Sequence, residues 1–379
     1  MLRMIEVLYA LQKFSGALPR RGCAFLLFVF ALFYNASINA AEVHSTESLL
    51  LEGDLISQKQ KPNIRDNIST VVIKGGLLVV AADEGADILV FKKTDHLKYS
   101  EVLPNCIPLD GEDCGSTRKG REVDIEGMAW GKKYLYVIGS HSRARKKVNS
   151  DKSADENKDS LETLIIEPTR EQLFRLELDA QGAIAQGSKI KKLSLRNLFL
   201  NHRILSLFQP VPGKENGIDI EGLAVKAVDG EDLLYIGFRG PVLRGNHAMI
   251  MVLEFDNGKF KQNKIKENPK IHYVNLGGRG IRGMTETGNG GFLLLAGPVG
   301  DAIIGDEKSR YQLFFWNGED DDVSGVARIP LCNVPVPSGA KAEGIELLNK
   351  DQTQAGGYRF VVVYDGAIKG GATVFTCQL

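Results

Sequence analysis

The chain has 379 residues, of which 43% are hydrophobic and 25% charged, a composition typical of a globular protein. Its 47 lysine and arginine residues are balanced by 47 aspartate and glutamate residues. This balance gives no electrostatic basis for binding a polyanion, so we expect no nucleic acid among its partners.

The amino terminus has the pattern of an export signal. Arg20 and Arg21 precede an unbroken apolar run, Cys23–Tyr34, and small and polar residues follow as far as Ala41. The run is too short to span the roughly 30 Å hydrocarbon layer of a bilayer, but it fits the core of a signal peptide. We therefore predict a signal peptide at 1–41, a mature domain at 42–379 that is periplasmic or secreted, and no stable membrane span after cleavage. An uncleaved anchor is the alternative.

The cysteines fit an oxidising compartment, because removing the signal leaves Cys106, Cys114, Cys332 and Cys377, an even number. Cys106 and Cys114 bracket a turn-rich loop and are expected to form a short disulfide. Metal ligation is the rival, but neither a C-x-x-C pair nor a nearby histidine supports it. Cys332 and Cys377 can pair only if the fold brings their segments together, so their pairing stays open.

The mature chain consists of short apolar strands separated by turns, and the strands group into repeated units. An isolated strand at 48–55 comes first. The units that follow are expected at 67–91, 124–195, 219–276, 281–331 and 342–379. A full unit holds about four strands, but the last one is a strand short, and the strand at 48–55 can complete it.

Repeated β units of this size are typical of propeller blades. We predict an all-β fold, a five-bladed β-propeller closed by an N-terminal strand that completes the last blade. Six blades are the alternative if 197–212 hides a further unit, although its apolar spacing is more typical of a helix or loop. A polar, charged insertion at about 144–168 lengthens the second unit and is predicted to be a disordered surface loop.

A short acidic motif recurs at the start of the first strand of the units. It reads Asp124-Ile125-Glu126-Gly127, Asp219-Ile220-Glu221-Gly222 and Ala342-Glu343-Gly344, with the variant Gly280-Ile281-Arg282-Gly283. In the first unit, Ile68 falls near the Glu position. First strands of propeller blades run along the central channel, so these side chains are expected to converge there.

Three glutamates and Arg282 would give this ring a formal charge of −2, which a divalent cation could balance. Calcium is favoured because it accepts flexible oxygen coordination. The candidate metal ligands are Glu126, Glu221 and Glu343, with Asp124 and Asp219. The alternative is that the glutamates bond backbone N–H groups of the next blade while the glycines permit bulges where blades crowd. The two roles are compatible.

Basic residues follow the ends of the second strands, at the same mouth of the channel. Arg143, Arg239 and Arg244, together with Arg282, are candidates for binding a small anion, because guanidinium groups bind phosphate or carboxylate in pairs of hydrogen bonds. Solvated arginines are the alternative. His141 is a candidate catalytic base, with a rim residue as its alternative.

The sequence contains neither G-x-S-x-G nor H-E-x-x-H, so it does not decide whether the protein is an enzyme. The leading hypothesis is an exported propeller that binds a phosphate ester or acidic sugar, with metal-assisted hydrolysis as its chemistry. The competing hypothesis is a non-enzymatic scaffold or ligand-binding module of the cell envelope.

The motifs at Asp124–Gly127 and Asp219–Ala224, with Ile138–Ser142 and Gly237–Val242, resemble a bacterial family catalogued as domain of unknown function 3616. The resemblance extends from about Asn67 to the carboxyl end and implies a propeller fold and export. More distantly, the Glu-Gly repeats are similar to exported calcium-binding propellers of the SdiA-regulated type and to phytase-like and esterase-like propellers. The sequence departs from the repeated Glu at Ile68 and Arg282, so these two units do not supply a carboxylate to a metal site.

Overall fold

The structure is a computed structural model that describes residues 43, 45–53, 66–115, 122–300, 310–320, 328–348, 357–367 and 371–377. Contacts divide the chain into two units, Met1–Asn39 and Ala40–Leu379. The predicted signal peptide at 1–41 lies outside the described residues. Within the described residues, no helix has the length and apolar character needed to cross a membrane.

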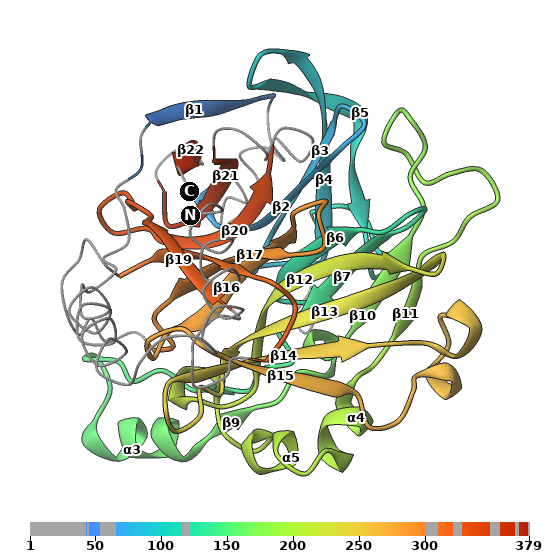
Figure 1. The fold of residues 1–379 in the computed structure, drawn as a ribbon. Helices are drawn as coiled ribbons and strands as arrows, with labels where there is room; N and C mark the ends of the chain where they lie inside the picture. The colour runs from blue at the N-terminus through green and yellow to red at the C-terminus, as the bar shows by residue number, and fades with distance from the viewer. Residues whose placement is uncertain are drawn as a thin grey trace, which may run out of the picture. The chain divides into compact units, whose positions relative to one another are not determined.

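Three four-stranded antiparallel sheets form the middle of the chain (Figure 1), in the orders β11-β10-β7-β6, β12-β13-β14-β15 and β16-β17-β18-β19. Their strands are β6 (Ile125–Trp130), β7 (Leu135–Gly139), β10 (Leu173–Leu176), β11 (Lys191–Leu193), β12 (Asp219–Val228), β13 (Glu231–Gly240), β14 (His247–Leu253), β15 (Lys270–Asn275), β16 (Gly280–Glu286), β17 (Phe292–Gly297), β18 (Gln312–Trp316) and β19 (Arg328–Asn333). The predicted middle units therefore correspond to one sheet each.

The two ends of the chain share an eight-stranded sheet with the order β2-β3-β4-β5-β1-β22-β21-β20. Its strands are β1 (Ser45–Glu52), β2 (Ile68–Lys74), β3 (Leu77–Ala82), β4 (Asp87–Asp95), β5 (Lys98–Pro108), β20 (Lys341–Leu347), β21 (Tyr358–Asp365) and β22 (Ala372–Cys377). The amino-terminal strand β1, blue in Figure 1, pairs antiparallel with the red β22, as expected of a strand that completes the last unit. It also pairs in parallel with β5, which the sequence did not indicate.

The first strands of the units contact one another in a closed cycle. β2 contacts β6, β6 contacts β12, β12 contacts β16, β16 contacts β20, and β20 contacts β2. Each of them has a bulge where one residue is skipped in the pairing with the second strand. The skipped residues are Ser69, Glu126, Glu221, Arg282 and Glu343.

The bulges correct one expectation. Ile68 does not occupy the Glu position of the first unit, because it pairs in register with Ala82 and is fully buried. The equivalent residue is Ser69, whose hydroxyl donates to the Ile125 carbonyl oxygen at 2.5 Å.

The glycine after the bulge lets neighbouring first strands approach closely. A Cβ atom on Gly127 would lie 2.9 Å from the Leu223 Cβ, and one on Gly344 would lie 2.8 Å from the Thr70 Cα. Real Cβ contacts are longer, so a side chain here would push the strands apart. The Glu-Gly repeat thus encodes a bulge and a close strand contact together.

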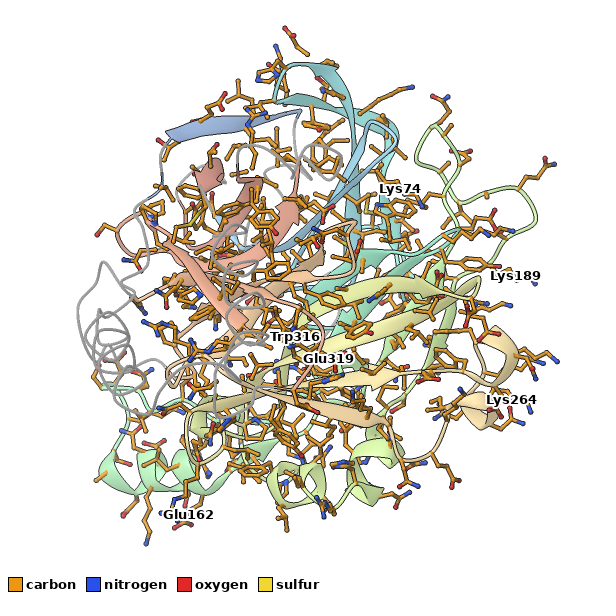
Figure 2. All side chains as sticks on the ribbon, viewed as in Figure 1. Lys74, Glu162, Lys189, Lys264, Trp316 and Glu319 are labelled. Atoms are coloured by element: carbon orange, nitrogen blue, oxygen red, sulfur yellow. A yellow bond between two sulfur atoms is a disulfide. The ribbon has the colours of Figure 1, made fainter. Side chains whose placement is uncertain are left out.

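Apolar side chains fill the space between successive sheets. The largest fully buried side chain is Trp316 on β18, which packs against Phe292 with 5.1 Å between ring centroids. Its indole N–H donates to the Glu319 carbonyl oxygen, and the two residues lie near each other in Figure 2. Burial of the indole is therefore accompanied by a hydrogen bond.

Two disulfides reinforce the sheets. Cys106 on β5 is bonded to Cys114, which confirms the predicted short bridge. Cys332 on β19 is bonded to Cys377 on β22, so the pairing that the sequence left open joins two sheets. Both bonds indicate an oxidising compartment.

The insertion at 144–168 differs from the disordered loop that its composition predicts. It forms β8 (Ala144–Arg145), α3 (Ala154–Glu162) and β9 (Leu164–Ile165). Local hydrogen bonds supply the order, since Ser153 and Glu156 form a capping box at the start of α3. The side chain of Asn157 also bonds the backbone of Asn149.

The segment at 197–212, which would hide a further unit in a six-bladed fold, is helical. It contains most of α4 (Arg196–Asn201) and all of α5 (Leu205–Phe208). Figure 1 shows α3, α4 and α5 along one side of the sheets. This segment therefore adds no strand to a sheet.

Candidate functional site

A cavity of about 530 Å³ lies where the first strands begin. The carboxylates of Glu126, Glu221 and Glu343 line it, and one oxygen from each lies within 4.8 Å of the others. Their convergence follows from the bulges, because each glutamate is the skipped residue of its strand. These three candidate metal ligands are therefore brought together, with Glu221 and Glu343 buried and Glu126 half-buried.

Arg282 neutralises part of this cluster. Its Nη1 donates to Glu221 Oε1 at 3.1 Å, and its Nη2 donates to Glu343. Its Nε lies 2.9 Å from Glu221 Oε2 and also donates to the Ala342 carbonyl oxygen at 3.4 Å. The guanidinium is only 3% exposed and does not line the cavity, so it supports the carboxylates instead of facing a ligand.

Arg239 provides a second positive charge that the sequence did not assign to the ring. Its Nη1 lies 2.7 Å from Glu221 Oε1, and its Nη2 donates to Asp219. Three carboxylates and two guanidinium groups leave the ring a formal charge of −1 instead of the expected −2. Glu126 is the member with no ion pair or hydrogen bond to another described residue.

The environment raises the proton affinity of these carboxyl groups. Burial raises the pKa of Glu221 to about 7, with Arg239 and Arg282 opposing the rise. Burial also raises the pKa of Glu126 well above its usual range, and the nearby Glu221 and Asp124 add to that rise. Repulsion between carboxylates at this distance favours either a proton or a cation among them.

Asp124 and Asp219 line the cavity, but other residues hold their carboxylates. Asp219 accepts from Arg239. Asp124 accepts from the Ser140 hydroxyl and lies 3.2 Å from Arg170 Nη1. They are thus placed near the three glutamates without joining the cluster.

Two further acidic residues line another part of the wall. Asp83 follows β3, and burial raises its pKa to about 7, with repulsion from Asp124 and Asp365 contributing. Asp365, at the end of β21, accepts from Lys341 Nζ at 2.6 Å. Both lie at or just past the end of the second strand of their unit, where the sequence places the shared mouth.

His141 does not face the cavity, which removes it as a candidate base there. It is 1% exposed, its ring centroid lies 5.3 Å from that of Phe199, and burial lowers its pKa to about 4. His141 follows the end of β7 with a left-handed backbone, φ 56°, and its Nδ1 lies 2.9 Å from the Gly139 carbonyl oxygen. Ser140 and Ser142 lie on the side of Asp124, so His141 faces the core.

The arginines predicted to bind an anion separate into different environments. Arg143 lines the cavity, as does Arg239, although the latter is engaged by carboxylates. Arg244 is exposed on the loop between β13 and β14 and does not line the cavity.

Several cavity residues were missed from the sequence. Lys341 occupies the position two residues before Glu343, where two other units have Asp124 and Asp219, so aligning the repeats could have found it. The other basic residues that were missed are Arg145, Lys146, Lys147, Arg170 and Lys214. Most lie in or beside the insertion, where no repeat places them.

The alternative role of the glutamates, bonding backbone N–H groups of the next unit, finds no support among the described residues. The hydrogen bonds of Glu221 and Glu343 go to Arg282. Between β2 and β6, a backbone N–H is bonded by Thr70 instead of a glutamate, since its Oγ1 accepts from the Met128 N–H at 3.2 Å.

Comparison with solved structures finds matches at low sequence identity and with TM-scores below 0.5. YCF48 from Cyanidioschyzon merolae is 11% identical with a TM-score of 0.34, over 84% of this chain and 69% of that chain. The exo-beta-1,3-galactanase from Phanerochaete chrysosporium is 9% identical with a TM-score of 0.41, over 87% of this chain and 64% of that one. MPT-4, a mannose phosphorylase from Leishmania mexicana, is 11% identical with a TM-score of 0.40, over 89% of each chain.

These similarities carry no activity to this chain. No curated protein matches it. A family model described as "Protein of unknown function (DUF3616)" matches residues 67–372, which is most of the chain.

Proposed function

Because the chain belongs to the family described as "Protein of unknown function (DUF3616)", whose description names no activity, we propose a function from the site alone. The protein is a β-propeller whose central cavity binds a small anionic ligand together with one divalent cation. The observation that carries the proposal is the position of Glu126. Its carboxylate lies beside those of Glu221 and Glu343, has no cationic partner among the described residues, and lines a cavity with a basic wall.

The propeller has five blades in this proposal. Each first strand in the cycle of β2, β6, β12, β16 and β20 is the innermost strand of one blade. The eight-stranded sheet then comprises the first and last blades, joined edge to edge through β1. Such closure leaves no open edge between the ends of the chain.

The cation lies between Glu126, Glu221 and Glu343, and calcium fits best because it accepts carboxylate oxygens in flexible geometry. Glu126 is free of other partners in the described chain, and Glu343 Oε2 is buried without a hydrogen-bond partner. Arg239 and Arg282 already compensate two charges, so one divalent cation balances Glu126 together with Asp219, which shares Arg239 with Glu221.

The anion lies above the carboxylates, against Arg143, Lys146, Lys147 and Lys214. A phosphate ester or acidic sugar would contact both the basic wall and the cation. Hydrolysis is the chemistry that a cation-bound water would add, with Asp83 able to accept a proton near neutral pH. The same residues would serve a binding module of the cell envelope without turnover, and the two disulfides agree with a periplasmic or secreted protein.

The cation is tested by calorimetric titration of the chelator-treated protein with calcium. Wild type is expected to bind one calcium ion, and Glu126→Gln, which keeps the side-chain shape but removes the charge, is expected to bind it at least about tenfold more weakly. Glu177→Gln is the matched control, because Glu177 pairs with Lys133 outside the cavity. Absence of calcium binding to wild type, or equal binding to Glu126→Gln, would contradict the proposal.

The anion is tested by titrating the calcium-loaded protein with methyl phosphate and with galacturonate, representing the two ligand classes. At least one is expected to bind, and replacing Lys146 and Lys147 with glutamine should weaken that binding. Lys189, labelled in Figure 2 at the edge of the ribbon away from α3, is a control lysine whose replacement should have no effect.

A further inference from the structure

The insertion at 144–168 exposes an unusual number of large apolar side chains for so polar a segment. Val148 is 54% exposed, Leu161 is 53%, Leu164 is 37% and Ile166 is 46%. Val148 and Leu161 line the cavity. The part of the wall that they form is therefore apolar and open to the cavity.

The same insertion carries basic groups beside these apolar side chains. Lys146 and Lys147 are exposed, line the cavity, and form no ion pair with another described residue. Arg145, by contrast, is bonded to Glu215 and to the Leu161 carbonyl oxygen. The cavity wall thus places two uncommitted positive charges next to two exposed apolar groups.

This wall is held in place by hydrogen bonds instead of being a free loop. The Gly213 N–H donates to the Arg143 carbonyl oxygen at 2.9 Å, and Arg145 bridges the insertion to Glu215. The insertion is therefore fixed to the segment before β12, which also lines the cavity. A preformed wall loses little entropy when a ligand packs on it.

We propose that the ligand is an amphiphilic anion, an organophosphate or similar monoester whose alkyl or aryl group packs on Val148 and Leu161. This inference rests on the proposed function and adds the chemical class of the ligand. The anionic head faces Lys146, Lys147 and the cation, while the apolar group covers side chains that are otherwise exposed to water. Removing that apolar surface from water favours binding in proportion to the area covered. The cavity volume of about 530 Å³ is in the range of small-molecule sites.

The test compares methyl phosphate with hexyl phosphate, two monoesters with the same charge, by calorimetry on the full mature protein with calcium. Hexyl phosphate is expected to bind at least about tenfold more tightly, because several additional methylene groups leave water. In a Val148→Ser/Leu161→Ser variant this preference should fall to about twofold or less. Leu207→Ser is the control, since Leu207 is 69% exposed but does not line the cavity.

The outcomes separate the two proposals. Equal binding of the two esters to wild type, or a preference that survives in the double variant, overturns the apolar subsite and leaves the proposed function standing. Failure of both esters to bind overturns the phosphate-ester form of the proposed function and this inference together. Melting curves that match wild type confirm that the serine variants are folded.

Discussion

Replacing Arg282 is the most informative perturbation of the carboxylate cluster. Arg282→Met keeps a long side chain but removes the guanidinium that pairs with Glu221 and Glu343. Both carboxylates are buried, so the variant leaves them with one guanidinium at ion-pair distance, that of Arg239, which pairs with Glu221. Glu343 then has no cation at ion-pair distance among the described residues.

The expected cost follows from the burial of the pair. Removing one member of a buried ion pair typically lowers the free energy of unfolding by about 3–5 kcal/mol, because the other charge stays buried. For a domain of this size, each kcal/mol corresponds to about 2 °C, so the melting temperature should fall by about 6–10 °C. Lys266→Met, which breaks an exposed pair with Glu254, should lower the free energy of unfolding by less than about 1 kcal/mol.

Thermal melting at pH 5 and pH 8 checks this reasoning. Burial raises the pKa of Glu221 to about 7 and also raises the pKa of Glu343, so at pH 5 Glu221 is mostly protonated and no longer needs a positive partner. The loss caused by Arg282→Met should therefore be smaller at pH 5 than at pH 8, and calcium should restore part of it at pH 8. A loss that is equal at the two pH values, or no larger than that of Lys266→Met, would refute the electrostatic account.

Three further predictions concern the wall, the strand cycle and the closure. The pKa of Asp83 is about 7 in the folded state against an ordinary 3.8, so its contribution to stability is present below pH 4 and is lost as the pH rises through 7. Asp83→Asn should therefore stabilise the protein at pH 8 by up to about 4 kcal/mol and have little effect at pH 4. Denaturant titrations at the two pH values measure the difference. Gly344→Ala places a Cβ 2.8 Å from the Thr70 Cα and should lower the free energy of unfolding by about 1–3 kcal/mol. Gly371→Ala, whose nearest contact is at 3.5 Å, should lower it by less than half as much. Equal melting temperatures for the two variants would refute the close-contact argument. Deleting Ser45–Glu52 uncovers the edges of β22 and β5 and should produce aggregation in size-exclusion chromatography, so a monomer with the wild-type melting temperature would contradict the closure.

The parts of the fold that sequence could predict are those encoded by repetition. The Glu-Gly motif recurs because every first strand has a bulged residue at the axis, and in β6, β12, β16 and β20 a glycine follows it. This is why the ring of Glu126, Glu221, Arg282 and Glu343 could be expected before the structure. The closing strand could be expected as well, because one strand was spare and the last unit lacked one.

The parts that sequence could not predict depend on side-chain direction and on contacts between distant segments. His141 lies one residue from the cavity-facing side, and a strand-end position does not specify which way its ring points. Arg239 approaches Glu221 from a neighbouring strand, so the charge of the ring depended on a contact that no motif records. The insertion was misjudged because its composition is polar, whereas its order comes from a capping box and from the bond between Arg145 and Glu215.

The most direct test of the central claim is anomalous diffraction from crystals of the mature protein grown with terbium, a calcium substitute with strong anomalous scattering. The account predicts one strong peak among Glu126, Glu221 and Glu343, at about 2.3–2.6 Å from carboxylate oxygens of at least Glu126 and Glu343. The peak should disappear in Glu126→Gln crystals. A cavity without a peak in wild type, with the three carboxylates still converged, would contradict the claim that this ring holds a cation.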